Sequence, residues 1–81
     1  MVQVVLPGSL KAAAGGRTRL EAEAANIRQL LTRLADDYPR LKPQLDRGVS
    51  ISIDGRIYRD AWFQPIPPES EVYLLPRLAG G

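Results

Sequence analysis

Few residues of this 81-residue chain have side chains that could perform covalent chemistry. It contains no cysteine and no histidine, which excludes disulfides, thiolate or imidazole metal ligands and a cysteine nucleophile. Asp36-Asp37 and Glu69 with Glu71 have the residue type of a carboxylate pair or a metal site. A domain this small cannot enclose a deep cleft, so we expect these carboxylates to be solvated or to serve in caps and turns. Gly15-Gly16 lacks the lysine and hydroxyl residue of a phosphate-binding loop.

The given sequence ends in Gly80-Gly81. A terminal Gly-Gly is either a dispensable end or a segment shaped for function. Glycines without side chains can pass through a narrow channel, and six extended residues span at most about 20 Å. The sequence 76–81 shows no helix or strand pattern and is expected to be a flexible tail behind a folded domain of residues 1–75.

Alternating apolar residues predict the strands that would hold such a tail. The alternation covers Val2 to Leu6, Arg17 to Ala24, Val49 to Ile53 and Val72 to Leu75, with a short return strand over Ile57 to Arg59. Asp54-Gly55 is typical of a two-residue hairpin turn. Residues 10–16 are expected to form a loop, and residues 62–68 a proline-rich loop.

One helix is predicted between the second and third strands. Ile27, Leu30, Leu31 and Leu34 recur with helical spacing. Asn26 is a suitable N-cap, with Gln29 completing a capping box, and Pro39 ends the helix near residues 36–38. A turn or short helix bearing Leu41 and Leu45 would close the core. The order β-β-α-β-β-β predicts a two-layer α+β domain. The expected core is Val4, Leu6, Leu20, Ile27, Leu30, Leu31, Leu34, Ile51, Ile53 and Val72.

The chain resembles the MoaD/ThiS family of ubiquitin-like sulfur carriers. The resemblance rests on Gly80-Gly81 at a fixed distance behind the strand Glu71–Leu75, on Tyr38-Pro39 after the helix, on the Asp54-Gly55 turn and on the element order. It implies a β-grasp fold: a mixed sheet of four or five strands on one main helix, with the strands from Val2 and Val72 parallel at its centre. Two positions depart from the family pattern, Glu69-Ser70 in place of Gly-Asp and Asp54 in place of Asn.

The resemblance also implies an activity. In this family an E1-like adenylating enzyme uses ATP and magnesium to adenylate the C-terminal glycine, here Gly81, and the adenylate becomes a thiocarboxylate that donates sulfur. The chain would be a co-substrate or a small subunit rather than an enzyme, with no cofactor of its own. We expect the acceptor to be a molybdopterin precursor and the partner to be the large subunit of molybdopterin synthase. Sulfur carriage for thiamin or cysteine synthesis, a protein modifier and a β-grasp interaction module without tail chemistry are the alternatives.

Partner binding is expected at the tail and next to it, through Leu75, Pro76, Arg77, Leu78, Ala79 and Phe63. Aromatic residues are favoured interface anchors, but Trp62 is expected to cap the core under the proline-rich loop. Tyr58 and Tyr73 are expected to pack on the sheet. Arg77 has two readings, an ion pair with an acidic partner residue or a solvated side chain.

Composition excludes several partners. A net charge of +2 comes from eleven basic and nine acidic residues scattered along the chain, so nucleic-acid binding is not expected. No apolar run approaches the roughly 20 residues that span a bilayer, and the first residues lack the pattern of a signal peptide. A cytoplasmic location, without membrane association, is the expectation.

Overall fold

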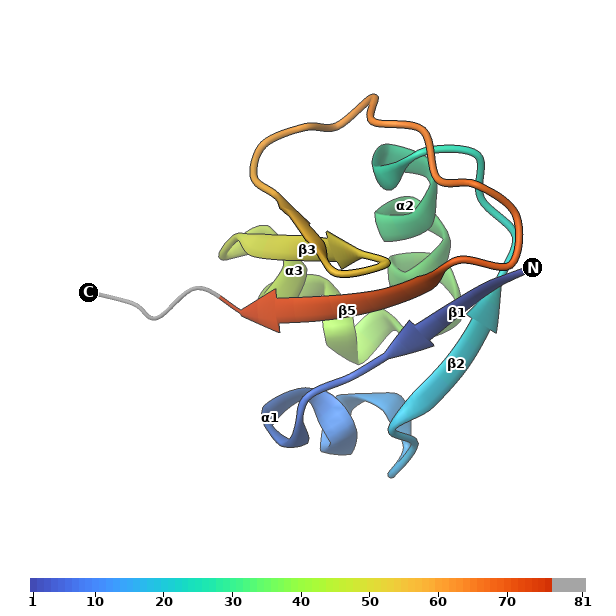
Figure 1. Ribbon diagram of the computed structural model, residues 1–81. Helices are drawn as coiled ribbons and strands as arrows, with labels where there is room; N and C mark the ends of the chain where they lie inside the picture. Colours follow the sequence, from blue (N-terminus) through green and yellow to red (C-terminus); the bar gives the residue numbers. More distant parts are fainter. Residues whose placement is uncertain (77–81) are drawn as a thin grey trace.

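The computed structural model describes residues 1–76 (Figure 1). They form five strands, three short or medium helices and two 3-10 turns. In chain order these are β1 (Val2–Val5), α1 (Gly8–Lys11), η1 (Ala12–Ala14), β2 (Arg19–Ala22), α2 (Ile27–Asp37), η2 (Pro39–Leu41), α3 (Lys42–Asp46), β3 (Val49–Ile53), β4 (Arg56–Tyr58) and β5 (Glu71–Pro76).

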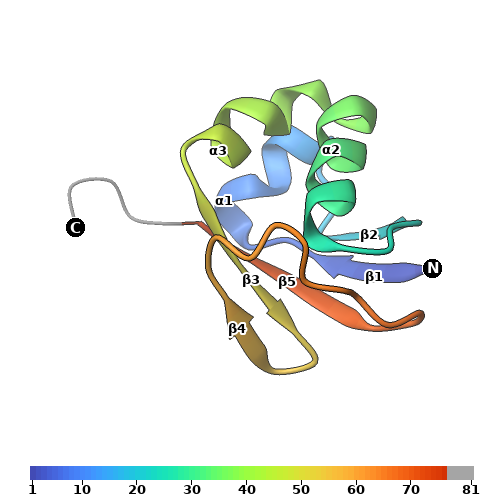
Figure 2. The same cartoon turned by 90° about the horizontal axis from the view of Figure 1, so that it is seen from above.

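The five strands form one mixed sheet in the order β2-β1-β5-β3-β4. β1 and β5 are parallel neighbours at its centre, with Val4 opposite Val72, and the other pairs are antiparallel. All helices lie on one side of this sheet and leave its other face uncovered (Figure 2). The structure thus confirms the predicted two-layer β-grasp fold and the central pair of parallel strands.

The core lies between the sheet and α2. Val4, Val72 and Leu74 on the inner face of the sheet are at most 1% exposed. The same holds for Leu30 and Leu34 of α2. Nine of the ten predicted core residues are buried, and the tenth, Leu31, is half-buried. The prediction for Trp62 is wrong, because its side chain is 49% exposed and Ile66 is the buried residue of that loop.

The loop before β5 is fastened to the start of α2. The Asn26 side chain accepts a hydrogen bond from the Gln29 N–H, which confirms the N-cap. The Gln29 side chain bonds to the N–H of Ala25, one residue before the position that a capping box would use. The N–H groups of Ile27 and Arg28 donate to the carbonyls of Gln64 and Trp62. The first turn of α2 therefore has backbone partners from residues far away in sequence.

One turn and one helical segment show how the local sequence determines the backbone. Asp54 and Gly55 both have positive φ, 49° and 91°, as the predicted hairpin turn requires. The prediction of a loop over residues 10–16 is wrong for residues 10–14, which belong to α1 and η1. Three consecutive alanines favour helical backbone, and Leu10 and Ala14 are buried by it. The second and last strands also differ slightly from expectation, since β2 is shorter and β5 extends to Pro76.

Candidate functional site

The C-terminal strand is the central strand of the sheet. β5 pairs with β1 on one side and with β3 on the other, and its last residue, Pro76, lies opposite Val49. The five following residues lie outside the described part of the chain, and with them five of the predicted site residues: Arg77, Leu78, Ala79, Gly80 and Gly81. The strand that leads to this segment is thus held between two neighbouring strands.

An apolar patch lies on the outer face of the sheet, near the end of β5. Side chains alternate along β5, so Val72 and Leu74 enter the core while Tyr73 and Leu75 point outward, 40% and 37% exposed. Ile57 of the edge strand β4 is 61% exposed. Ser50 and Ser52 pair with Leu75 and Tyr73 across the sheet and are covered, at 6% and 8% exposure. We call Ile57, Tyr73 and Leu75 the outer patch.

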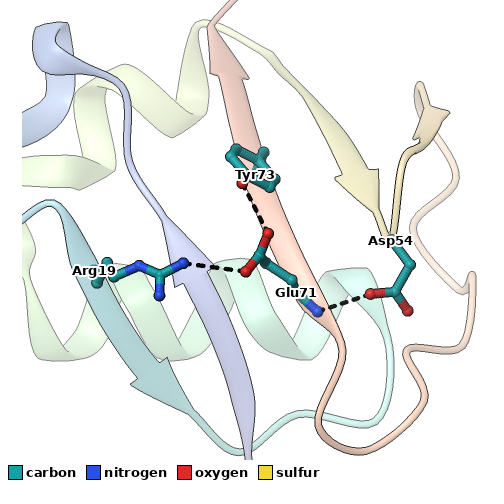
Figure 3. A network of polar contacts seen from close by, with 4 residues as sticks. All are labelled: Arg19, Asp54, Glu71 and Tyr73. Carbon is teal, nitrogen blue, oxygen red and sulfur yellow. Dashed lines mark hydrogen bonds and ion pairs between the residues drawn. The ribbon is translucent and has the colours of Figure 1, made fainter.

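A polar network borders the outer patch (Figure 3). The Glu71 carboxylate accepts a hydrogen bond from the Tyr73 hydroxyl at 2.8 Å and pairs with the Arg19 guanidinium of β2 at 3.1 Å. The bond to Glu71 raises the pKa of the Tyr73 hydroxyl, and the negative charge of Glu71 adds to the effect. Tyr73, expected only to pack on the sheet, is therefore half of a surface pair.

The hairpin turn between β3 and β4 is tied to the start of β5. Its Asp54 carboxylate accepts a hydrogen bond from the Glu71 N–H at 2.9 Å (Figure 3). The Asp54 N–H in turn donates to the Glu71 carbonyl at 3.0 Å. Asp54 and Glu71 thus form a closed pair of bonds between the turn and β5. This gives Asp54, where the family pattern has Asn, a structural role that the amide would also fill.

A second exposed apolar region lies on the helical side. Phe63 is 71% exposed and Trp62 is 49% exposed, and the Arg28 guanidinium lies 5.9 Å from the centre of the Phe63 ring. With Leu31 and Thr32 of α2, these side chains line a groove of about 390 Å³. We call these five residues the aromatic groove.

The predicted partner-binding residues are divided between these two regions. Leu75 belongs to the outer patch, on the face of the sheet that the helices do not cover, whereas Phe63 lies against α2. Pro76 is half-buried at the end of β5. Ile57 and Tyr73 were not among the predicted site residues. Their alternation with Tyr58 and Leu74 was the signal that could have placed them on the outer face.

The carboxylates that suggested a metal or acid–base site have other partners, or no ion pair among residues 1–76. Glu69 pairs with the amino group of Met1 at 2.8 Å, and Glu71 belongs to the network of Figure 3. Within residues 1–76 no three acidic residues are grouped so as to hold a metal ion. No helix among these residues is long and apolar enough to cross a membrane.

A β-grasp domain whose central strand leads to the C-terminal residues is the architecture of a ubiquitin-like protein. The sequence model of the ThiS family matches residues 4–81, nearly the whole chain. The chain therefore belongs to the ThiS family and is a ubiquitin-like sulfur carrier by family. No curated protein sequence matches it significantly.

Solved structures of similar fold come from both bacteria and archaea. CysO in the Amycolatopsis orientalis BexX/CysO complex has a TM-score of 0.82 at 19% identity, and the match covers 100% of both chains. Small archaeal modifier protein 1 from Methanosarcina acetivorans has a TM-score of 0.78 at 26% identity over 99% of this chain and 95% of that one. A chain in the complex of subunits 1 and 2 of molybdopterin-converting factor from Helicobacter pylori has a TM-score of 0.70 at 21% identity. That match covers 99% of this chain and 97% of the other.

Proposed function

We propose that this chain carries sulfur as a thiocarboxylate on Gly81 and delivers it in molybdopterin biosynthesis, as the small subunit of molybdopterin synthase. The observation that carries the proposal is the family match, which extends through the terminal Gly80-Gly81. The chain itself would be a co-substrate that two larger enzymes act on in turn.

The chemistry begins with a carboxylate, which is a poor electrophile because it has no good leaving group. An activating enzyme would join the Gly81 carboxylate to the AMP moiety of ATP and release pyrophosphate. A sulfur nucleophile would then attack the acyl carbon, the acyl–oxygen bond to AMP would break, and AMP would leave with the electron pair. The product is a thiocarboxylate with one oxygen replaced by sulfur, and ATP supplies the driving force.

The described residues support this chemistry by position. Pro76 ends a strand held on both sides, so the domain can remain outside an enzyme while the five following residues, at most about 17 Å when extended, reach inward. Glycine at 80 and 81 would pass a narrow channel where any side chain would clash. Ordering such a segment costs about 1–2 kcal/mol per residue, so a surface of the domain must contribute binding energy.

The outer patch is the surface we propose for that purpose. Leu75 and Tyr73 stand on the strand that leads to the tail, and Ile57 extends the apolar area to the sheet edge. Exposed apolar residues gathered on a small domain mark docking sites. Leu75 and Pro76 would contact the enzyme first, and Arg77, Leu78 and Ala79 would continue the contact toward the reacting carbon.

The intact mass of the protein tests the proposal. Incubation with the host's activating enzyme, ATP and a sulfur source should raise the mass by the difference between one sulfur and one oxygen atom. A variant lacking Gly81 should show no change. If the full chain also stays unchanged, with an enzyme that activates another carrier, the proposal is wrong. Transfer of the sulfur to a molybdopterin precursor, with the synthase large subunit present, then tests the acceptor.

Protein modification is the second candidate, because a small archaeal modifier protein matches at 26% identity over nearly the whole chain. Both functions require activation of Gly81, but only a modifier forms isopeptide bonds to lysine. Conjugates of higher mass that persist under reducing, denaturing conditions would favour the modifier. Their absence, together with a formed thiocarboxylate, would favour sulfur carriage alone.

A further inference from the structure

Helix α2 carries its charged residues at the ends where its own dipole opposes them. A helix N-terminus favours negative groups and a C-terminus favours positive ones. The first turn of α2 has no acidic residue but holds Arg28, and the last turn has no basic residue but holds Asp36 and Asp37. Neither Arg28 nor Asp36 has an ion-pair partner in residues 1–76. Within one molecule the contact of Arg28 with the Phe63 ring offsets part of this electrostatic cost, whereas Asp36 has no ion pair among residues 1–76.

These two charges terminate one exposed stripe of the helix. Arg28, Leu31, Thr32, Ala35 and Asp36 follow at helical spacing, and the stripe is about 12 Å long at 1.5 Å per residue. Arg28, Thr32 and Asp36 line one continuous surface together with Phe63. Leu31 and Ala35 are half-buried, and Thr32 is exposed. The stripe has Arg28 at one end, Leu31, Thr32 and Ala35 in the middle, and Asp36 at the other end, and Glu23 and Arg33 line the same surface.

We propose that the occupant of this face is a second copy of the chain, bound through an antiparallel pair of α2 helices. A two-fold axis near Thr32 places Arg28 of each copy opposite Asp36 of the other. Each charge then lies at the helix end of the other copy that favours it, so the intramolecular conflict becomes an intermolecular attraction. Such an interface is self-complementary, as a two-fold interface must be.

The shape of the face fits the same arrangement. Phe63 projects at the Arg28 end of the stripe. At the Asp36 end, a hollow of about 550 Å³ lies between α2, α3 and the strand start at Gly48-Val49. The two-fold axis exchanges the ends, so Phe63 of each copy enters the hollow of the other. Thr32 and Ala35 at the centre are small enough to let helix axes approach to about 8–10 Å.

The aromatic side chains are already positioned for this contact. The Trp62 carbonyl accepts from the Arg28 N–H at 2.8 Å, and the Gln64 carbonyl accepts from the Ile27 N–H at 3.1 Å. These bonds hold the loop against α2, so little backbone ordering is needed on association. The sheet's outer face lies on the other side of the domain, so the outer patch stays exposed in the pair (Figure 2).

Sedimentation equilibrium across a concentration series tests the proposal. The interface is small, so we expect dissociation in the range of roughly 10 µM to 1 mM, with the mass rising from 8.9 kDa toward twice that value. Arg28→Glu and Asp36→Arg should each weaken association at least tenfold, because each places like charges opposite one another. The double variant should recover part of it, because the ion pairs are re-formed with reversed sign, although each charge then opposes the dipole of the partner helix. Phe63→Ser should weaken it as well.

Arg17→Glu is the matched control, since it makes the same charge change at an exposed loop residue and should leave association unchanged. All these positions are exposed, so the variants should fold, and circular dichroism checks that. Three results would overturn the proposal: a wild-type mass of 8.9 kDa throughout the series, a double variant that does not recover, or association abolished by Leu75→Ser but not by Phe63→Ser.

Discussion

The two exposed apolar regions of this domain differ in how their charged neighbours are paired. At the outer patch, the Glu71 carboxylate accepts a hydrogen bond from Tyr73 of the same strand and pairs with Arg19 of β2 (Figure 3). In the aromatic groove, the Arg28 guanidinium lies over the Phe63 ring, and neither Arg28 nor Asp36 has an ion pair among residues 1–76. The charges at the outer patch are therefore paired within the single chain. The charges on the face of α2 would be paired only by an opposite charge from another molecule.

This difference suggests a division of roles. A partner that docks on the outer patch meets apolar side chains and has few charges to desolvate, which suits an enzyme that must release the carrier after each reaction. A partner on the α2 face gains two ion pairs and must match their spacing. Variants that separate effects on folding from effects on binding test this difference between the two faces.

The largest effect should come from Leu74→Ala, because Leu74 is 1% exposed and packs under the outer patch from β5. Truncating a buried leucine removes its burial and leaves a cavity, at a cost of about 2–5 kcal/mol in the free energy of unfolding. Leu75→Ala, one residue further on, should cost less, about 1 kcal/mol, since its outward side chain is 37% exposed. Urea denaturation measures both.

The same pair separates stability from docking. Leu75→Ala should raise the KM of the activating enzyme for the carrier while the folded fraction stays unchanged. Equal KM values for wild type and Leu75→Ala would remove the outer patch from the proposed docking surface. Similar stability losses in the two variants would show that the alternation of β5 is assigned to the wrong faces.

Asp54→Ala should have the next effect. It removes the acceptor for the Glu71 N–H and leaves a non-glycine residue without side-chain compensation at a φ of 49°. We expect a loss of about 1–2 kcal/mol in the free energy of unfolding. Asp54→Asn keeps an acceptor oxygen and suits the turn, so its stability should stay close to that of the wild type. A loss in Asp54→Asn as large as in Asp54→Ala would show that the charge, and not the hydrogen bond, matters.

The Asp54 turn also illustrates what the sequence predicts well. Alternation, the Asn26 cap and the Asp54-Gly55 turn are local signals, and the structure confirms all three. The parallel pairing of β1 with β5 followed from the family resemblance, because periodicity does not specify which strands are neighbours. Helix α1 was missed because four residues are too few to show helical spacing, and its glycine neighbours favoured a loop.

The faces of the site residues were harder to predict. The exposure of Trp62 depends on the path of its loop, which is determined by backbone bonds to α2, more than 30 positions earlier in the chain. No local pattern encodes such a contact. The outer patch was within reach, since the alternation that buries Val72 and Leu74 must expose Tyr73 and Leu75. Residues 77–81 lie outside the part of the chain that the structure describes, so the roles predicted for them stay predictions.

A smaller effect of opposite sign is expected on the α2 face. Asp36→Arg replaces an acidic residue in the last turn of α2 with a basic one, which the helix dipole favours. At low concentration we expect the monomer to gain about 0.3–1 kcal/mol in the free energy of unfolding. The same variant should associate more weakly than the wild type. A variant that is less stable as a monomer would indicate that Asp36 already has a favourable role within the single chain.

The smallest effect should be a pH dependence on the outer face. The Glu71 carboxylate raises the pKa of the Tyr73 hydroxyl in the folded state, so the protonated hydroxyl is favoured there. Its contribution to stability is therefore fully present below the unfolded pKa of about 10, and it is lost as the pH rises through the higher folded value. Absorbance titration of the tyrosines, together with stability measured between neutral and alkaline pH, tests this.

Glu71→Gln removes the charge that raises the pKa and should lower the titration midpoint of Tyr73 toward that of a free tyrosine. Tyr73→Phe identifies which of the three tyrosines accounts for the late-titrating absorbance. Because both residues are on the surface, the change in stability should be slight and should diminish at high salt. An unchanged midpoint in Glu71→Gln would mean that the hydroxyl of Tyr73 is not held by Glu71 in solution. The polar groups at the outer patch would then be as available to a binding partner as the charges on the α2 face.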